Sequence, residues 1–349
     1  MAIFKKPKSA EELETVNIAD KETAGLSQGQ IVRRRFVRHR AAMVSVFALL
    51  SIFLLTFSAV DAQIGPVTTN GWWQYGIEDL PELVIGEDGT LGAPTIDAVP
   101  FFDGDGVELG NHPFGQDDIG RDYFALVMSG AQRSITIMLV IGFVAATIGT
   151  VIGAVAGFFR GWVDAILMRL ADFFITIPSI VIGSVIGYQF GNLGIVFLGL
   201  FLGFFAWMGL SRLVRGEFLT LREREFVDAA RVAGASNRRI IFKHILPNAV
   251  GVIIVSVTLL MSGAILLETA LSYLGFGVVF PDVSLGLLIS KYQDAFVTQP
   301  WLFWYPGLFI IGIALSINFI GDGLRDAFDP RQRRRITRKE RAEAKSASR

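Results

Sequence analysis

The side chains that could do chemistry in this sequence are few, and the most informative lie beside long apolar runs. Glu268 follows an uncharged run of twenty residues, and Asn318 lies near the end of another apolar run. A charged side chain at membrane depth is costly, so it is usually paired or functional. Two roles are open for Glu268: contact with the amino group of a solute that crosses the membrane, or a position at the membrane interface. We take Glu268 and Asn318 as candidates for a translocation path.

Signatures of catalysis are absent from the sequence. No Gly directly precedes a Lys, so the GxxxxGK[ST] loop that binds ATP is missing. HExxH and GxSxG do not occur, three scattered His make no zinc site, and there is no Cys. We therefore expect no enzyme activity, no metal and no cofactor in this chain. The sequence favours a conduit that is powered from outside.

The composition is that of a polytopic all-α membrane protein. Of 349 residues 52% are hydrophobic, and the mean hydropathy is +0.50. About 20 apolar residues are needed to cross a bilayer as a helix. Six runs approach or exceed this length, and Pro178 should kink the third. The predicted spans are 41–60, 134–159, 173–191, 193–211, 248–267 and 303–321.

Two of these spans carry glycines four residues apart. The second has Gly149, Gly153 and Gly157, and the third has Gly183, Gly187 and Gly191. Such a stripe of small residues lets helix backbones approach closely. We expect the two stripes to pack on each other or on a partner.

The charges are strongly segregated although the net charge is zero. Basic residues number nine in 1–40, eight in 212–243 and ten in 325–349, while 41–120 has none. Because basic segments stay on the cytoplasmic side, both termini and residues 212–243 should be cytosolic. The chain then divides into five parts. They are a cytosolic tail with an interfacial helix (1–40), a first span (41–60), an acidic external segment (61–133), a five-helix core that includes a loop at 213–247 (134–324), and a basic cytosolic tail (325–349).

Several charged side chains near the spans have simple local interpretations. Arg169 and Asp172 are three apart in sequence and should pair with each other. Arg212 and Arg215 should extend their charged ends to the membrane surface. In the external segment, Trp72 and Trp73 fit an interfacial anchor better than a contact for a partner.

The charged stretch at residues 222–248 is predicted to form a helical hairpin. Phe226, Ala229 and Ala230 recur at helical spacing and give the first helix a smooth face. Gly234 can adopt the left-handed conformation that ends a helix, and Ser236 or Asn237 can cap a second one. Pro247 fits the first turn of the next span. The alternative is a juxtamembrane helix pair with no special role.

This stretch resembles the "EAA" loop of ATP-binding-cassette (ABC) importer permeases. The resemblance is carried by DAAxxxG at 228–234 and HILP at 244–247, with Asp228 for the usual Glu and His244 for the usual Ile. HPFGQDDIGRD at 112–122 is similar to an element of dipeptide, oligopeptide and nickel permeases, with Gln116 for the usual Thr. SYLGFG, PWLFWYPG and NFIGDGLRDAFDP resemble the same family, and together the motifs cover about residues 26–330.

The resemblance implies a type I importer architecture with six transmembrane helices. It implies a similar permease, two ABC ATPases that bind ATP and Mg, an external solute-binding protein and membrane lipid as partners, with no nucleic acid. The residues that it assigns to ATPase coupling are Phe226, Asp228, Ala229, Ala230, Gly234, Ala235, Ser236, His244 and Pro247. Di- or oligopeptides are the expected solute. Nickel or another small solute is the alternative, and an ion channel or membrane enzyme is less favoured.

Overall fold

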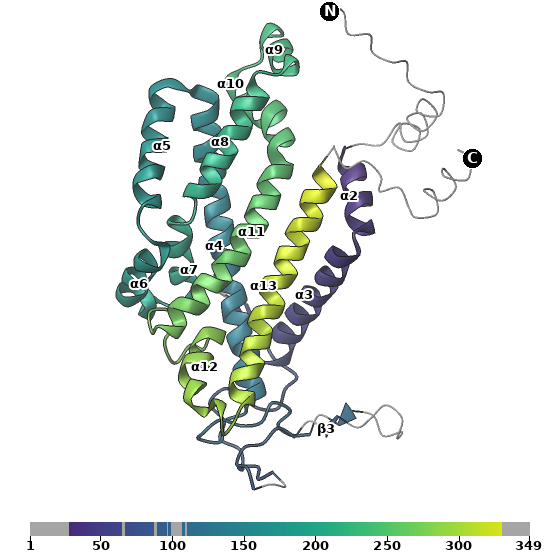
Figure 1. Ribbon diagram of the computed structural model, residues 1–349, viewed down its shortest axis with the longest axis vertical. Coiled ribbons are helices and arrows are strands. Elements are labelled where there is room, and N and C mark those ends of the chain that lie inside the picture. Colours follow the sequence, from purple (N-terminus) through teal and green to yellow (C-terminus); the bar gives the residue numbers. More distant parts are fainter. Residues whose placement is uncertain are drawn as a thin grey trace, which may run out of the picture.

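The structure is a computed structural model that describes residues 28–64, 67–86, 89–95, 97–98, 107–108 and 110–329. The described chain forms long helices that run side by side in one elongated bundle (Figure 1). The N-terminal tail up to residue 27 and most of the basic C-terminal tail lie outside the described residues.

The helices are, in chain order, α2 (Gln28–Arg38), α3 (Arg40–Ala59), α4 (Tyr123–Phe159), α5 (Gly161–Ile175), α6 (Ser179–Phe190), α7 (Ile195–Phe204), α8 (Met208–Arg222), α9 (Glu225–Val232), α10 (Asn237–Arg239), α11 (Leu246–Tyr273), α12 (Leu285–Tyr292) and α13 (Trp301–Phe328). The shorter elements are the 3₁₀ turns Gly191–Leu193 and Gln293–Phe296 and the π-helix η2 (Ile240–Ile245). Two antiparallel strand pairs join β1 (Ala62–Ile64) to β2 (Val67–Thr69) and β3 (Asp97–Ala98) to β4 (Val107–Glu108).

The predicted fold class, an all-α polytopic membrane protein, is confirmed. In the described chain four helices are long and apolar enough to cross a membrane, namely α3, α4, α13 and the helix that runs through residues 237–273. Two bent helix pairs raise the number to six if each pair is one span. The first, second, fifth and sixth predicted spans therefore correspond to continuous helices.

The third and fourth predicted spans are broken, which the apolar runs alone did not indicate. α5 and α6 meet at 79°, and α7 and α8 meet at 47°. Pro178 lies just before α6, so it interrupts the third span instead of kinking it. Proline lacks an N–H and disfavours helix in the preceding residue, which explains a complete break at this point.

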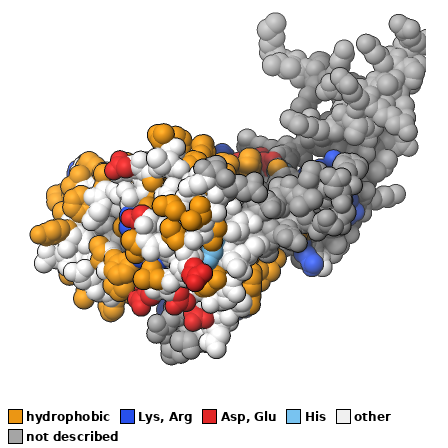
Figure 2. Space-filling model, turned by 90° about the horizontal axis from the view of Figure 1, so that it is seen from below, with side chains coloured by type: hydrophobic (Ala, Val, Ile, Leu, Met, Phe, Trp, Pro, Cys, Tyr) orange, Lys and Arg blue, Asp and Glu red, His pale blue; other side chains and the backbone are white. Residues whose placement is uncertain are grey.

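The two ends of the bundle differ in what they carry. Figure 1 shows α9 and α10 at one end, with α2 beside the last turns of α13, and α12 at the other end with the start of α4. We call these the hairpin end and the acidic end. Figure 2 views the acidic end and shows Asp and Glu side chains gathered on it.

Close contact between α4 and α8 organises the hairpin half of the bundle. A Cβ added at Gly153 would lie 2.5 Å from the backbone oxygen of Ser211, and one at Gly157 would lie 2.7 Å from that of Arg215. The stripe on the second span therefore packs on α8, where side chains would not fit. Gly183, on the third span, instead packs on Leu271 of α11. The prediction that the two stripes pack on each other is wrong.

Three ion pairs join the α5 segment to the α8 segment. Arg160 lies just before α5, and Glu223 lies just after α8. Arg160 pairs with Glu223 at 2.5 Å, Asp164 with Arg215 at 2.6 Å, and Asp172 with Arg212. We call these pairs the α5–α8 ladder. The predicted pairing of Arg169 with Asp172 is wrong, because Asp172 finds its partner on another helix. Arg212 and Arg215 are likewise held by carboxylates and do not simply extend to the surface.

A buried polar network fixes the start of α4 at the acidic end. The Asp122 carboxylate caps α4 by accepting from the backbone N–H of Ala125, and it also accepts from Trp73 Nε1 at 2.9 Å and contacts His112 Nδ1 at 2.7 Å. Burial raises the pKa of Asp122, and these hydrogen bonds oppose the rise. The anchor interpretation fails for Trp73, which is bonded inside the protein, whereas Trp72 is 57% exposed.

A second network ties the same motif to α12. Arg121 donates to Asp117 at 2.7 Å and to the Tyr292 hydroxyl at 3.1 Å, and Tyr292 donates to Asp117 at 2.8 Å. All three side chains are buried. Gln116 accepts from the Val84 N–H and thereby holds the acidic segment. Charge-assisted bonds within this motif therefore tie α12 to the residues before α4 at the acidic end.

Candidate functional site

The predicted helical hairpin is present at residues 225–245, and its turn has the geometry that the sequence indicated. Gly234 has φ +79°, in the region that favours glycine. The N–H of Gly234 donates to Arg231 O and that of Ala235 donates to Ala230 O, which together make a Schellman motif. Ser236 then caps α10 by accepting from the N–H of Arg239. The chain therefore reverses within a few residues.

The inner side of the hairpin is firmly seated on the bundle. Val227 and Ile245 are fully buried, and Ile240 and Ile241 are nearly so. They form one apolar cluster with side chains of α4, α8 and α11: Ala154, Phe158, Leu210, Val214, Phe218 and Ala249. Ala235 is partly buried against the same cluster. A force on the hairpin would therefore act on three long helices at once.

The outer side of the hairpin exposes several apolar side chains among its charges. Val232 is 91% exposed, Phe242 is 62% exposed and Phe226 is 39% exposed. Ala229 and Ala233 are exposed between them. Ala230, in contrast, is buried on the same side of α9 as Val227, so it is not on the exposed face with Phe226 and Ala229, and its part in ATPase coupling stays a prediction. We call Phe226, Ala229, Val232, Ala233 and Phe242 the hairpin tip.

Charges around the hairpin tip are accessible and weakly paired. Asp228 pairs with Arg231 at 3.1 Å, with exposed fractions of 65% and 40%. Exposed pairs of this kind contribute about 0–1 kcal/mol, so Asp228 is free to exchange its partner. Glu225 and Asp228 lie in the first turn of α9, where negative charge complements the helix dipole.

The hairpin continues into α11 through a π-helix. After α10 the residues Ile240–Ile245 form η2, and Pro247 lies in the first turn of α11, as predicted. His244 is partly buried, and its backbone oxygen accepts from Asn248 at 2.6 Å. π-Helical turns are uncommon and occur often at functional sites.

Glu268 lies on α11 and is fully buried. Its carboxylate accepts from Ser134 Oγ at 2.9 Å and from Ser272 Oγ at 2.7 Å. Ser134 in turn accepts from the N–H of Leu285, so the group joins α4, α11 and the start of α12. Glu268 is therefore enclosed by protein, and its position relative to the membrane interface stays a prediction. Contact with a solute stays a prediction that requires this packing to open. Asn318 lies on α13 and is partly buried.

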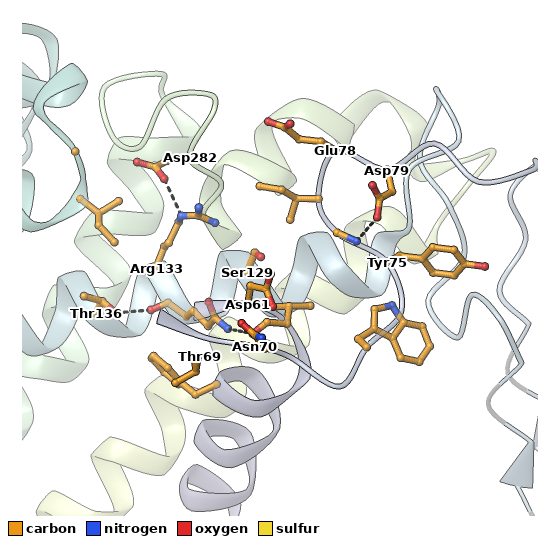
Figure 3. A pocket seen from close by; sticks show the side chains of 18 of the residues that line it. Asp61, Thr69, Asn70, Tyr75, Glu78, Asp79, Ser129, Arg133, Thr136 and Asp282 are labelled. Carbon is orange, nitrogen blue, oxygen red and sulfur yellow. Dashed lines mark hydrogen bonds and ion pairs between the residues drawn. The ribbon is translucent and has the colours of Figure 1, made fainter. Parts of the chain in front are cut away.

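A large polar cleft opens at the acidic end. Its volume is about 1020 Å³, and it lies between the end of α3, the segment 69–79, α4 and the start of α7. Figure 3 shows the carboxylates of Asp61, Glu78 and Asp79 around it, with Arg133 bonded to Asp282 at 2.8 Å. Acidic groups outnumber basic ones here, so the cleft suits positively charged groups better than anions.

Sequence reasoning missed the residues that complete these arrangements. Tyr292, Ser134 and Val232 each lie far from their partners in sequence or carry no motif. Ser272 could have been found, because it lies four residues after Glu268 on one helix and therefore on the same face.

Comparison with known proteins decides the family. The model of the family "Binding-protein-dependent transport system inner membrane component" matches residues 149–334, more than half of the chain. The chain belongs to this family. A second model, the "N-terminal TM domain of oligopeptide transport permease C", matches residues 27–69. The match of the first model includes the hairpin, and the match of the second includes α2 and α3.

Curated relatives cover nearly the whole of this inner membrane component. The oligopeptide transport system permease protein OppC of Mycobacterium bovis is 36% identical over 309 residues, covering 88% of this chain and 96% of the relative. The OppC of Haemophilus influenzae is 35% identical over 329 residues, which cover 93% of this chain and 96% of the relative. A putative peptide permease protein of Brucella ovis is 40% identical over 309 residues, covering 87% and 92%.

Among solved structures, one titled as an inward facing conformation of the MetNI methionine ABC transporter is similar. Its chain is 20% identical with a TM-score of 0.49, covering 58% of this inner membrane component and 96% of that chain.

Proposed function

We propose that this inner membrane component is the permease subunit of an ATP-driven importer of di- or oligopeptides. It supplies half of the translocation path, and a similar permease supplies the other half. Two ABC ATPases bind ATP and Mg and drive transport, and an external solute-binding protein delivers the solute. The names of relatives that align over nearly the whole chain support peptides over nickel. Uptake of labelled peptide and of nickel by cells that express the complex would test this choice.

The observation that carries the proposal is the hairpin tip, apolar and exposed while its other side is seated on α4, α8 and α11. An apolar patch on a charged end of a protein indicates a contact with another protein. The ATPase would receive the tip, and its closure would move the three helices together. In this proposal Phe226, Ala229 and Val232 make the contact, Gly234 and Ser236 fix the turn, and η2 with Pro247 transmits the movement to α11.

The orientation follows from this assignment and from the positive charges at the hairpin end. The hairpin and both termini would be cytosolic, and the acidic end with its cleft would be external. Because the chain has no Cys, single cysteines report it directly. In the chain expressed without its ATPases, Val232→Cys, at a 91% exposed position, should react with an impermeant maleimide from the cytosolic side alone, and Leu80→Cys, at 65%, from the outside alone. The reverse pattern would refute the orientation.

The coupling role is tested by replacing Gly234 with Val in the reconstituted complex. A β-branched residue at φ +79° is strained by about 1–3 kcal/mol, so the turn should distort and peptide-stimulated ATP hydrolysis should fall. Asp228→Lys should weaken ATPase co-purification without loss of membrane insertion. Gly216→Val is the matched control, since nothing lies within 4 Å of a Cβ there. Full coupled hydrolysis in both test variants would refute the assignment.

A further inference from the structure

The short helix α2 presents two different faces. Residues 32, 35, 36 and 39 follow one side of the helix, and residues 33, 34, 37 and 38 follow the other. Val32 and Phe36 are partly buried on the first side, and Arg33, Arg34 and Arg38 are exposed on the second. We call Arg33, Arg34, Val37 and Arg38 the α2 outer face.

The inner face of α2 is fixed to the end of α13. Arg35 donates to the backbone oxygen of Asp329 at 2.9 Å. His39 accepts from the N–H of Ala42 through Nδ1, and its Nε2 lies 3.5 Å from Asp326. The Phe36 side chain packs on Gly323 of α13, where an added Cβ would lie 3.3 Å from the ring. The direction in which the outer face points is therefore set by the bundle.

The outer face lies at the level where a bilayer has its headgroups. α3 begins at Arg40, and its apolar residues begin at once with Ala41. Arg33 and Arg38 are separated by about 7.5 Å along the helix at about 1.5 Å per residue. The headgroup layer on each side of the hydrocarbon core is about 5–8 Å thick. The three arginines therefore span this layer in the direction away from the core.

The chemistry of the outer face matches anionic phospholipid. Within the part of the chain that the structure describes, no carboxylate pairs with Arg33, Arg34 or Arg38. Val37, between them, is 55% exposed. Guanidinium groups bind phosphate with two parallel hydrogen bonds, and an apolar side chain among them suits the boundary between headgroups and acyl chains. An acidic protein surface would pair with the arginines but would offer no apolar contact to the Val37 side chain.

We propose that the α2 outer face binds anionic phospholipid headgroups of the cytosolic leaflet. The inference rests on the proposed orientation but not on the proposed solute or on coupling to an ATPase. Bound lipid would hold α2 against the end of α13, because Arg35 and His39 transmit its position. Basic side chains beside a membrane contribute about 1 kcal/mol each, which is about fivefold in affinity.

The experiment places a fluorophore in the outer face and reads the lipid beside it. Because the chain has no Cys, the variant Val37→Cys has a single thiol. This thiol is labelled with the fluorophore, and the full-length protein is reconstituted in bilayers. Brominated phosphatidylglycerol and brominated phosphatidylcholine are then compared as quenchers. We expect half-maximal quenching at a several-fold lower mole fraction of phosphatidylglycerol, and we expect this preference to shrink in high salt.

Three variants decide whether the outer face is responsible. With R33Q, R34Q and R38Q together the several-fold preference should be lost, and with Lys at the same positions most of it should remain. The matched control removes three charges from the hairpin as R238Q, R239Q and K243Q and should keep the preference. Equal quenching by both lipids, or equal loss in the control, would overturn the proposal. So would a Gln variant that keeps the lipid preference but loses ATPase co-purification, because the face would then meet protein.

Discussion

Gly153 is the position at which the packing of α4 on α8 can be tested most sharply. The change Gly153→Ala adds one Cβ that would lie 2.5 Å from Ser211 O, 2.7 Å from Val214 Cβ and 3.0 Å from the backbone nitrogen of Arg215. Two of these atoms belong to the backbone and cannot rotate away. The helices must therefore separate, and the ion pairs and apolar contacts between them must adjust.

The magnitude follows from two opposing effects. Overpacking of a tight contact costs about 1–3 kcal/mol, and the rigid backbone contact argues for the upper end. Replacement of Gly by Ala inside a helix regains about 0.5–1 kcal/mol. The net loss should be about 2 kcal/mol, which is about a thirtyfold change in the unfolding equilibrium.

The control is Gly216→Ala on α8, where nothing lies within 4 Å of an added Cβ. This variant should gain about 0.5–1 kcal/mol from helix propensity alone. Both are measured by unfolding the purified chain in mixed micelles of dodecyl sulfate, with helicity followed by circular dichroism. If Gly153→Ala proved as stable as Gly216→Ala, the close α4–α8 contact would be refuted.

Three further predictions concern the ladder, the hairpin and the acidic end. Asp164→Arg and Arg215→Asp should each destabilise by about 1–2 kcal/mol, since the pair is partly buried, and the double swap should regain most of this in the same assay; no rescue would contradict the pair. Ser236→Ala removes the cap of α10 at a cost of about 1 kcal/mol, so amide exchange in residues 237–245 should quicken about fivefold; unchanged exchange would contradict the cap. Burial raises the pKa of Asp122, so its contribution to stability is full below the unfolded pKa of about 3.9 and is lost as pH rises through the higher folded pKa. Asp122→Asn should therefore make the thermal unfolding temperature less dependent on pH above about 4, and an unaltered pH profile would contradict this.

The sequence predicted those features that depend on local spacing. Apolar runs located the spans, because a helix in lipid needs a minimum length. Gly234 and Ser236 located the turn of the hairpin, because a left-handed backbone and a capping hydroxyl are properties of single residues.

Features that depend on which helices become neighbours could not be predicted in this way. The glycine stripe at 149–157 indicated a smooth surface but not that α8 would cover it. Asp172 has a basic residue three positions away, yet it pairs across helices with Arg212. Ala230 belongs to the periodic small residues of α9, but it packs in the apolar cluster beside Val227 and faces the bundle. In each case tertiary packing selected among partners that the sequence offered equally.

The breaks in the third and fourth spans have a mechanical consequence. The α5–α8 ladder holds α5 and α8 together, so the interruptions after Ile175 and before Met208 lie at similar depth. They divide this part of the molecule into two levels along the bundle, and α6 and α7 lie in the level nearer the acidic end. α4 passes through both levels as an unbroken helix of 37 residues. α11 also runs through both levels, since Ala249 packs in the cluster with α8 and Leu271 packs on Gly183 of α6. Any tilt of one level against the other must therefore be absorbed by bending of α4 and α11.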